Sequence, residues 1–129
     1  MKFSIQVNGS PYHSQASLMA FKFVQQALAM EHEVLRVFFY HEGVFNAFKY
    51  ATPLEDEQNL TQLWSNLAQQ YGVDLVICIS AAQRRALLTP DEASRQSKPG
   101  DDVADGFRIS GLGQWVEASL LADRFIIFG

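Results

Sequence analysis

The single cysteine of the chain, Cys78, is the residue best suited to covalent chemistry. It lies in an unbroken apolar stretch, Leu75 to Ile79, which is typical of a strand covered on both faces of a parallel sheet. Ser80 follows as an expected helix N-cap, and a helix is expected over residues 81–88. Such strand-to-helix turns lie at the carboxyl edge of a parallel sheet, where ligands usually bind.

The surroundings expected for Cys78 favour an anion. A thiol reacts as its thiolate, and the pKa of a free cysteine, about 8.5, falls next to cations or a helix N-terminus. Arg84 and Arg85 follow within two helical turns. An unreactive alternative stays open, because cysteine is among the most buried residue types and often packs as a small hydrophobe.

Other candidates are weaker. His41 and Glu42 are adjacent, which could indicate acid–base chemistry, but a solvated turn is the favoured interpretation. His13 and His32 have no ligand-like spacing with His41, so no metal site is expected. The G-L-G stretch at 111–113 lacks the third glycine of a dinucleotide-binding loop and is interpreted mainly as a tight turn that lets the backbone approach a neighbouring loop.

Alternating strands and helices must position these residues. Apolar runs predict five strands, at Phe3–Val7, Glu33–Tyr40, Leu75–Ile79, Phe107–Ser110 and Asp123–Phe128. Helical periodicity and capping residues predict helices at Gln15–Glu31, from Asn59 to Tyr71, over residues 81–88, from Thr89 onward and at Gln114–Ala122. We therefore expect an α/β layered domain with a mainly parallel five-stranded sheet and helices on both faces.

Four residues mark helix ends. Asn59 is an expected N-cap, and Gly72 an expected left-handed residue at a helix end. Thr89 can cap the next helix, with Glu92 completing a reciprocal capping box.

Composition limits the class of protein. The 129 residues suit one domain spanning 1–129, 48% of them are hydrophobic, and the net charge is −4. This charge argues against direct nucleic-acid binding. One cysteine permits no internal disulfide, no stretch is a membrane span, and the start of the chain has no signal-peptide pattern, so we expect a cytoplasmic protein.

The chain resembles the DsrE-like sulfur-relay family, and within it the TusD type of subunit. The resemblance is most specific in the block around Cys78 and in the S-G-L-G stretch of residues 110–113. It also rests on further matches in order along nearly the whole chain: Gly9, Tyr12, Gln15, Phe38-Phe39-Tyr40, Gly43-Val44, Asn46-Ala47, Glu117-Ala118-Ser119 and Asp123-Arg124. His13 and Ala86 depart from it, since relatives often have glycine there.

The resemblance implies a sulfurtransferase without cofactor. Cys78 aligns with the cysteine that accepts sulfur as a persulfide from a TusA-like donor and passes it to a TusE-like acceptor. The resemblance also implies that the sulfur ends in 2-thiouridine at the tRNA wobble position, and that TusB-like and TusC-like sister subunits complete a heterohexamer. Val44, Phe45 and Phe48 belong either to an interface with these subunits or to the core of this chain.

Backbone N–H groups are the expected stabilisers of the thiolate and persulfide. We assign this role to Ile79, Ser80, Ala81, Gly111 and Gly113. Three rival functions stay open: a DsrE-type subunit of a sulfur-oxidation pathway, a non-catalytic assembly subunit in which Cys78 only packs, and a nucleotide- or small-molecule-binding module that uses the glycines at 111–113.

Overall fold

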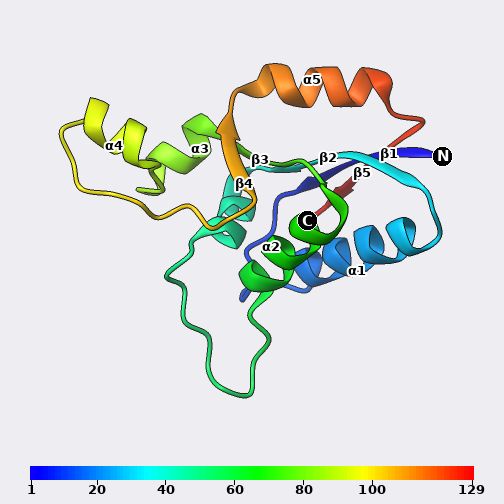
Figure 1. The fold of residues 1–129 in the computed structure, drawn as a ribbon, viewed down its shortest axis with the longest axis horizontal. Helices are drawn as coiled ribbons and strands as arrows, with labels where there is room; N and C mark the ends of the chain where they lie inside the picture. Colours follow the sequence, from blue (N-terminus) through cyan, green and yellow to red (C-terminus); the bar gives the residue numbers. More distant parts are fainter.

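All 129 residues are described by the computed structural model, in which five parallel strands form one sheet (Figure 1). The strands are β1 (Lys2–Val7), β2 (Glu33–Phe39), β3 (Leu75–Cys78), β4 (Phe107–Ser110) and β5 (Arg124–Phe128). The helices are α1 (Ala16–Ala29), α2 (Leu60–Tyr71), α3 (Ile79–Arg84), α4 (Pro90–Arg95) and α5 (Leu112–Leu121), with a 3-10 helix η1 (His41–Ala47). The predicted α/β class and parallel sheet are confirmed.

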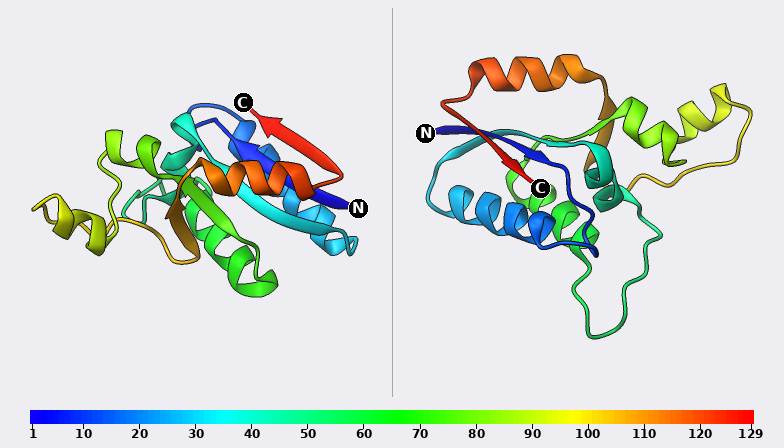
Figure 2. Two further views of the ribbon diagram at one scale, coloured as in Figure 1. Left: turned by 90° about the horizontal axis from the view of Figure 1, so that it is seen from above. Right: turned by 180° about the vertical axis from the view of Figure 1, so that it is seen from behind.

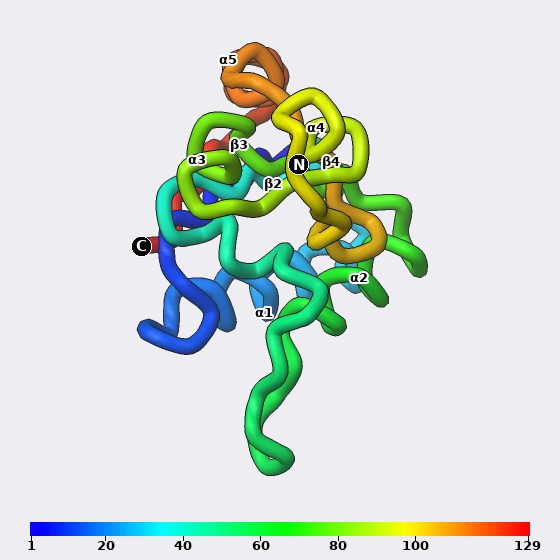
Figure 3. The backbone as a smooth tube through the Cα atoms, turned by 90° about the vertical axis from the view of Figure 1, so that its left-hand side faces the viewer, coloured from blue at the N-terminus to red at the C-terminus, as the bar shows by residue number.

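Strand order explains the layers. The order is β4-β3-β2-β1-β5, so the chain moves steadily to one side of β1 and then returns through α5 to the other side. Because crossovers between parallel strands are right-handed, the reversal puts α5 on the face opposite α1 and α2 (Figures 1 and 2). Helices α3 and α4 lie beyond the carboxyl ends of the strands, as the end-on view in Figure 3 also shows.

The two faces of the sheet differ in packing. On the α1–α2 face, Trp64 is fully buried, with its ring centroid 5.1 Å from that of Phe21 and 5.3 Å from that of Phe39. On the α5 face, Trp115 packs against Phe125 at 5.4 Å and donates a hydrogen bond to Gln6. Ala118 is the only buried residue of α5, so this second layer is thinner than the first.

Several predicted helix boundaries are confirmed. The Asn59 side chain accepts a hydrogen bond from the N–H of Gln62 at 3.1 Å, and Gly72 is left-handed at φ 70°. The Thr89 hydroxyl accepts from the N–H of Glu92. The reciprocal half of that capping box is wrong, because the Glu92 carboxylate bonds instead to Gln83 and Arg95.

The boundaries of α3 were predicted wrongly at both ends. Cys78, not Ser80, is the N-cap, since β3 ends where Cys78 pairs with Ser110 and the chain turns at once. The helix stops at Arg84 because Ala86 adopts a left-handed conformation, with φ 62°. Two hydrogen bonds fix this end, from the Leu87 N–H to the Ala82 carbonyl and from the Ala86 N–H to the Gln83 carbonyl.

Candidate functional site

The carboxyl ends of four strands meet at one edge of the sheet. The loop after β1, the 3-10 helix η1 after β2, helix α3 after β3 and the start of α5 after β4 all begin there. Cys78 is the last residue of β3 and stands in register with Ser110, the last residue of β4. The sequence-based placement of Cys78 at this edge, next to a helix start, is therefore confirmed.

Cys78 is buried, and its closest polar partner is a hydroxyl. The residue is only 1% exposed, and Sγ lies 3.4 Å from Oγ of Ser80. Ser80 itself is exposed, so the hydroxyl nearest the sulfur belongs to a surface residue. A serine hydroxyl can donate to a sulfur anion, a contact that sequence reasoning missed because it assigned the hydroxyl to helix capping.

The predicted backbone donors lie at two neighbouring helix starts. Ile79, Ser80 and Ala81 open α3, so their N–H groups have no acceptor within the helix. Gly111 is the N-cap of α5 and directly follows Ser110, the register partner of Cys78. The adjacent strands β3 and β4 thus bring both helix starts to the same edge of the sheet.

The close backbone approach predicted at Gly111–Gly113 is wrong, and so is the predicted helix start at Gln114. Helix α5 begins at Leu112, so Gly113 lies in its first turn, and a Cβ atom at either glycine would meet nothing within 4 Å. The close approach occurs at Gly43, where a Cβ atom would overlap the carbonyl oxygen of Val7. There η1 packs directly on the end of β1.

Charged groups near α3 are partly neutralised. Arg85 donates to Glu42 at 2.6 Å and to the Ala81 carbonyl at 3.1 Å, which fastens η1 to α3. Arg84 is exposed and forms no ion pair. His41 stacks on Tyr40 with 4.0 Å between ring centroids, while Glu42 is held by Arg85. His41 and Glu42 therefore have different partners.

A buried polar network, which was not predicted from the sequence, holds the loops at this edge. Asn46 is fully buried; its amide nitrogen donates to the Ser17 hydroxyl at 3.0 Å and to the Gly43 carbonyl at 2.9 Å. Its amide oxygen accepts from Trp64 at 3.2 Å. Ser17 in turn donates to the Gly9 carbonyl. The one available signal was a polar residue among apolar neighbours in the stretch 44–48.

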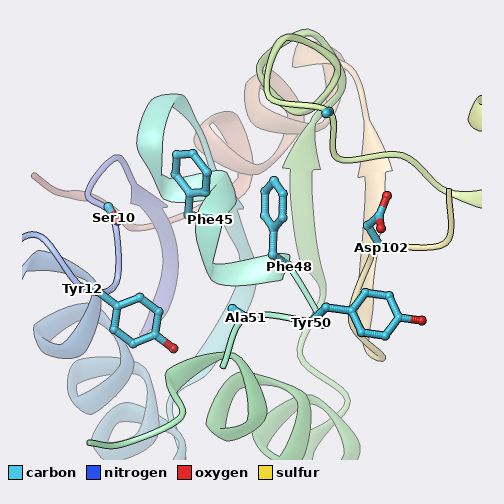
Figure 4. A pocket seen from close by; sticks show the side chains of 8 residues that line it. Ser10, Tyr12, Phe45, Phe48, Tyr50, Ala51 and Asp102 are labelled. Carbon is cyan, nitrogen blue, oxygen red and sulfur yellow. The ribbon is translucent and has the colours of Figure 1, made fainter. Parts of the chain in front are cut away.

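Residues 44–48, which follow β2, contribute side chains both to the core and to the surface. Val44 is fully buried in the core, so of the two predicted roles it takes the core one. Phe45 and Phe48 are half-buried, stack at 5.1 Å, and line an open cavity of about 400 Å³ (Figure 4). The other lining residues are Ser10, Tyr12, Tyr50, Ala51, Ala86 and Asp102.

Two further features of the chain concern metals and membranes. Nowhere do three or more His, Cys, Asp or Glu side chains gather closely enough to hold a metal ion. None of the helices has the length and apolar character needed to cross a membrane.

Comparison with known proteins gives consistent matches. The model of the DsrE/DsrF-like family matches residues 1–128. DsrE of Allochromatium vinosum, named as a candidate sulfurtransferase, is 48% identical over 129 residues, covering 100% of this chain and 99% of that protein. The crystal structure of the ychN protein from E. coli superposes with a TM-score of 0.79 at 20% identity, covering 99% of both chains. MTH1491 from Methanobacterium thermoautotrophicum, a protein of unknown function, superposes at 0.61 with 18% identity, covering 98% of this chain and 97% of that one.

Proposed function

Because this chain belongs to the DsrE/DsrF-like family, we propose that it is a sulfur-transfer subunit that carries sulfur on Cys78 as a persulfide. The observation that carries the proposal is the position of the one cysteine. Cys78 ends β3 at the carboxyl edge of the sheet, starts α3, and has the Ser80 hydroxyl 3.4 Å from its sulfur.

The chemistry is two successive displacements at sulfur. The Cys78 thiolate attacks the outer sulfur of a donor persulfide; a new S–S bond forms at Cys78, the donor S–S bond breaks, and its electron pair leaves on the donor thiolate. An acceptor thiolate then attacks the outer sulfur on Cys78, and the Cys78 thiolate leaves. Each step exchanges one S–S bond for another, so no outside oxidant or reductant is needed.

The surrounding groups suit the anions formed at each step. The Ser80 hydroxyl can donate to the thiolate or to the persulfide, and the N–H groups of Ile79, Ser80 and Ala81 face no helical acceptor. We assign a weaker role to Gly111 and Gly113, because they open the neighbouring helix at the same edge. No cofactor takes part in this scheme.

A lone cysteine suits a relay between proteins. No second thiol in the chain can displace the sulfur from Cys78, so the persulfide waits for a partner. We propose a TusA-like donor, a TusE-like acceptor and TusB-like and TusC-like sister subunits in a heterohexamer, acting in the reducing cytoplasm. In this pathway the sulfur reaches 2-thiouridine in tRNA, and this subunit makes no direct contact with nucleic acid.

A second pathway has equal support. The relative that is 48% identical is itself a DsrE protein, which is consistent with a DsrE-type subunit of a sulfur-oxidation pathway with the same chemistry at Cys78. Deleting the gene and measuring 2-thiouridine in total tRNA by mass spectrometry separates the two. Loss of the modified base assigns the chain to tRNA thiolation, and an unchanged level assigns it to sulfur oxidation.

The central test is intact mass after incubation with a persulfurated donor protein, with and without the sister subunits. We expect wild type to gain one sulfur atom that reduction removes, and Cys78→Ser to gain none. If wild type gains no sulfur even in the assembled complex, Cys78 is a packing residue and the chain is a non-catalytic assembly subunit.

A further inference from the structure

The open cavity at the carboxyl edge plays no part in the chemistry proposed for Cys78, which does not line it. Six of its eight lining residues are hydrophobic, and its volume of about 400 Å³ falls in the range of ligand pockets. The stacked rings of Phe45 and Phe48 form one wall (Figure 4). Tyr12 and Tyr50, which are 46% and 70% exposed, stand at its rim.

One side of this cavity is built by a loop that projects far from the body of the molecule. Figures 1 and 3 show the segment between η1 and α2, residues 48–59, extending away from the sheet. Tyr50 and Ala51 near its base line the cavity, and Leu54 further out is 71% exposed. Glu57 comes back close to Tyr12: partial burial and then the charge of Glu57 raise the pKa of Tyr12.

The net negative charge of the chain is concentrated on an acidic rim around this cavity, which we define as residues 49–58 and 101–102. Residues 49–58 and 101–102 hold one of the ten basic residues and five of the fourteen acidic ones. The rest of the chain therefore holds nine of each and is neutral. Lys49, the one base, is bound by Asp101 at 3.0 Å, while Asp102 lines the cavity. Glu55, Asp56 and Glu57 make no ion pair.

We propose that this cavity binds a large apolar or aromatic side chain carried by a basic segment of a partner protein. Buried aromatic and apolar side chains supply most of the binding energy of protein interfaces. The half-buried rings of Phe45 and Phe48 can pack against one such side chain. The acidic rim attracts positively charged flanking residues and repels nucleic acid. It also repels a second copy of this chain, which brings the same rim.

This inference rests on the proposed function in one respect: the partner is the protein that gives sulfur to Cys78 or receives sulfur from it. The cavity opens at the edge of the sheet where Cys78 ends β3, among the loops that follow β1 and β2. A segment anchored there would hold its protein against the same edge, which raises the effective concentration of the partner's cysteine.

Fluorescence anisotropy with short labelled peptides tests the recognition, in a Cys78→Ser background so that sulfur chemistry cannot contribute. The probe peptide has one phenylalanine flanked by lysines; one control replaces phenylalanine with alanine, and another replaces the lysines with glutamates. We expect only the probe to bind, more weakly as salt increases. Tyr50→Ala and Phe45→Ala should each weaken it about ten-fold, the loss of one packed anchor.

Matched control variants show whether a loss of peptide binding comes from the cavity and its rim or from a general change in the protein. Tyr71→Ala removes another exposed tyrosine, at the end of α2 and outside the cavity, and should leave binding unchanged. Replacing Glu55, Asp56 and Glu57 by Gln, Asn and Gln should weaken binding, whereas Glu31→Gln with Asp91→Asn, also exposed, should not.

Three results would overturn the proposal. The first is that the alanine peptide binds as tightly as the probe, and the second is that Tyr50→Ala and Phe45→Ala bind the probe as tightly as the unsubstituted surface. The third is that the free chain forms a dimer in sedimentation and Tyr50→Ala abolishes it. The last would assign the cavity to a second copy. The peptide assay does not depend on Cys78, so the two proposals can fail separately. Peptide binding by a protein whose Cys78 gains no sulfur in the mass assay would refute the proposed function alone. Sulfur gain at Cys78 without peptide binding would refute only this inference.

Discussion

Ala86 adopts a backbone conformation that alanine seldom takes. It follows Arg85, the C-cap of α3, with φ 62°, and the helix is closed by the hydrogen bonds of the Ala86 and Leu87 N–H groups. Glycine is the usual residue at this position because a Cβ atom strains the left-handed region. Ala86 therefore holds a strained conformation that glycine would adopt without strain.

Ala86→Gly should stabilise the protein by about 0.5–1 kcal/mol. The relief of left-handed strain, about 1–2 kcal/mol, exceeds the added freedom of glycine in the unfolded chain, about 0.5–1 kcal/mol. Chemical denaturation measures the change. Ala122→Gly is the control, since Ala122 has φ −79°, and it should be neutral or destabilising. A lower stability for Ala86→Gly would contradict the argument.

Ser80 gives the second prediction at this scale. Ser80→Ala should slow sulfur loading of Cys78 several-fold, because the hydroxyl 3.4 Å from the sulfur no longer donates to the anion. Ser80 is exposed, so folding should not change. Rates come from intact mass against time, with Ser94→Ala, an exposed serine on α4, as the control. Equal rates in all three proteins would show that the contact has no role in transfer.

At the level of elements, Asn46 joins three parts of the chain. Through its side chain, η1 is bound to the start of α1 at Ser17 and to α2 at Trp64. Asn46→Ala should lower the free energy of unfolding by about 2–4 kcal/mol, since it leaves buried donors and acceptors without partners. Asn66→Ala, on the exposed side of α2, should change it by less than about 0.5 kcal/mol. A small effect at Asn46, seen in urea denaturation, would mean that water replaces its bonds.

A second cluster fastens α5 to the sheet. Asp74 accepts hydrogen bonds from Arg108 at 2.7 Å and from Arg36 at 2.6 Å. Arg36 also donates to the main-chain carbonyl of Gln114, and Arg108 to its side chain. The first turn of α5 is thereby tied to β2 and β4, close to where α5 begins beside Cys78.

Asp74 should make stability depend on pH. The hydrogen bonds from Arg108, followed by those from Arg36 and the charges of both, lower the pKa of Asp74 below its ordinary 3.8 despite partial burial. A carboxylate with a depressed pKa stabilises the fold above its unfolded pKa, and this contribution is lost as the pH falls through the folded value.

Asp74→Asn should therefore cost about 1–3 kcal/mol at neutral pH, with the difference from wild type shrinking below about pH 4. Urea denaturation across this range measures it. A difference that stays constant down to strongly acid pH would show that packing, and not the charge of Asp74, holds α5.

At the level of the whole molecule, α5 exposes an apolar stripe. Leu112, Val116 and Leu120 are exposed and recur every fourth residue, and Ile127 of β5 is also exposed. A contiguous exposed apolar surface favours association. We expect the isolated chain to associate as its concentration rises, and Leu120→Gln to reduce this in sedimentation velocity. Met30→Gln, at an exposed position at the end of α1 and outside this stripe, should not; equal association of both variants would contradict the prediction.

The sequence predicted most of the architecture, because apolar runs and capping residues act locally. Neighbouring residues predicted a strand at Leu75–Ile79, observed at Leu75–Cys78, and the caps Asn59 and Thr89. The missed features depend on residues brought together from afar: the register with Ser110 ends β3 at Cys78, and the partners of Asn46 are 18 and 29 residues away. Local patterns carry no information on such contacts.

The placement of the two tryptophans gives each layer its own optical reporter. Trp64 lies in the α1–α2 layer among Phe21 and Phe39, and Trp115 lies in the α5 layer against Phe125. A chain with only one indole would therefore emit from one side of the sheet alone. Comparing Trp64→Phe with Trp115→Phe during denaturation would follow the two layers separately and reveal whether the thinner one melts first.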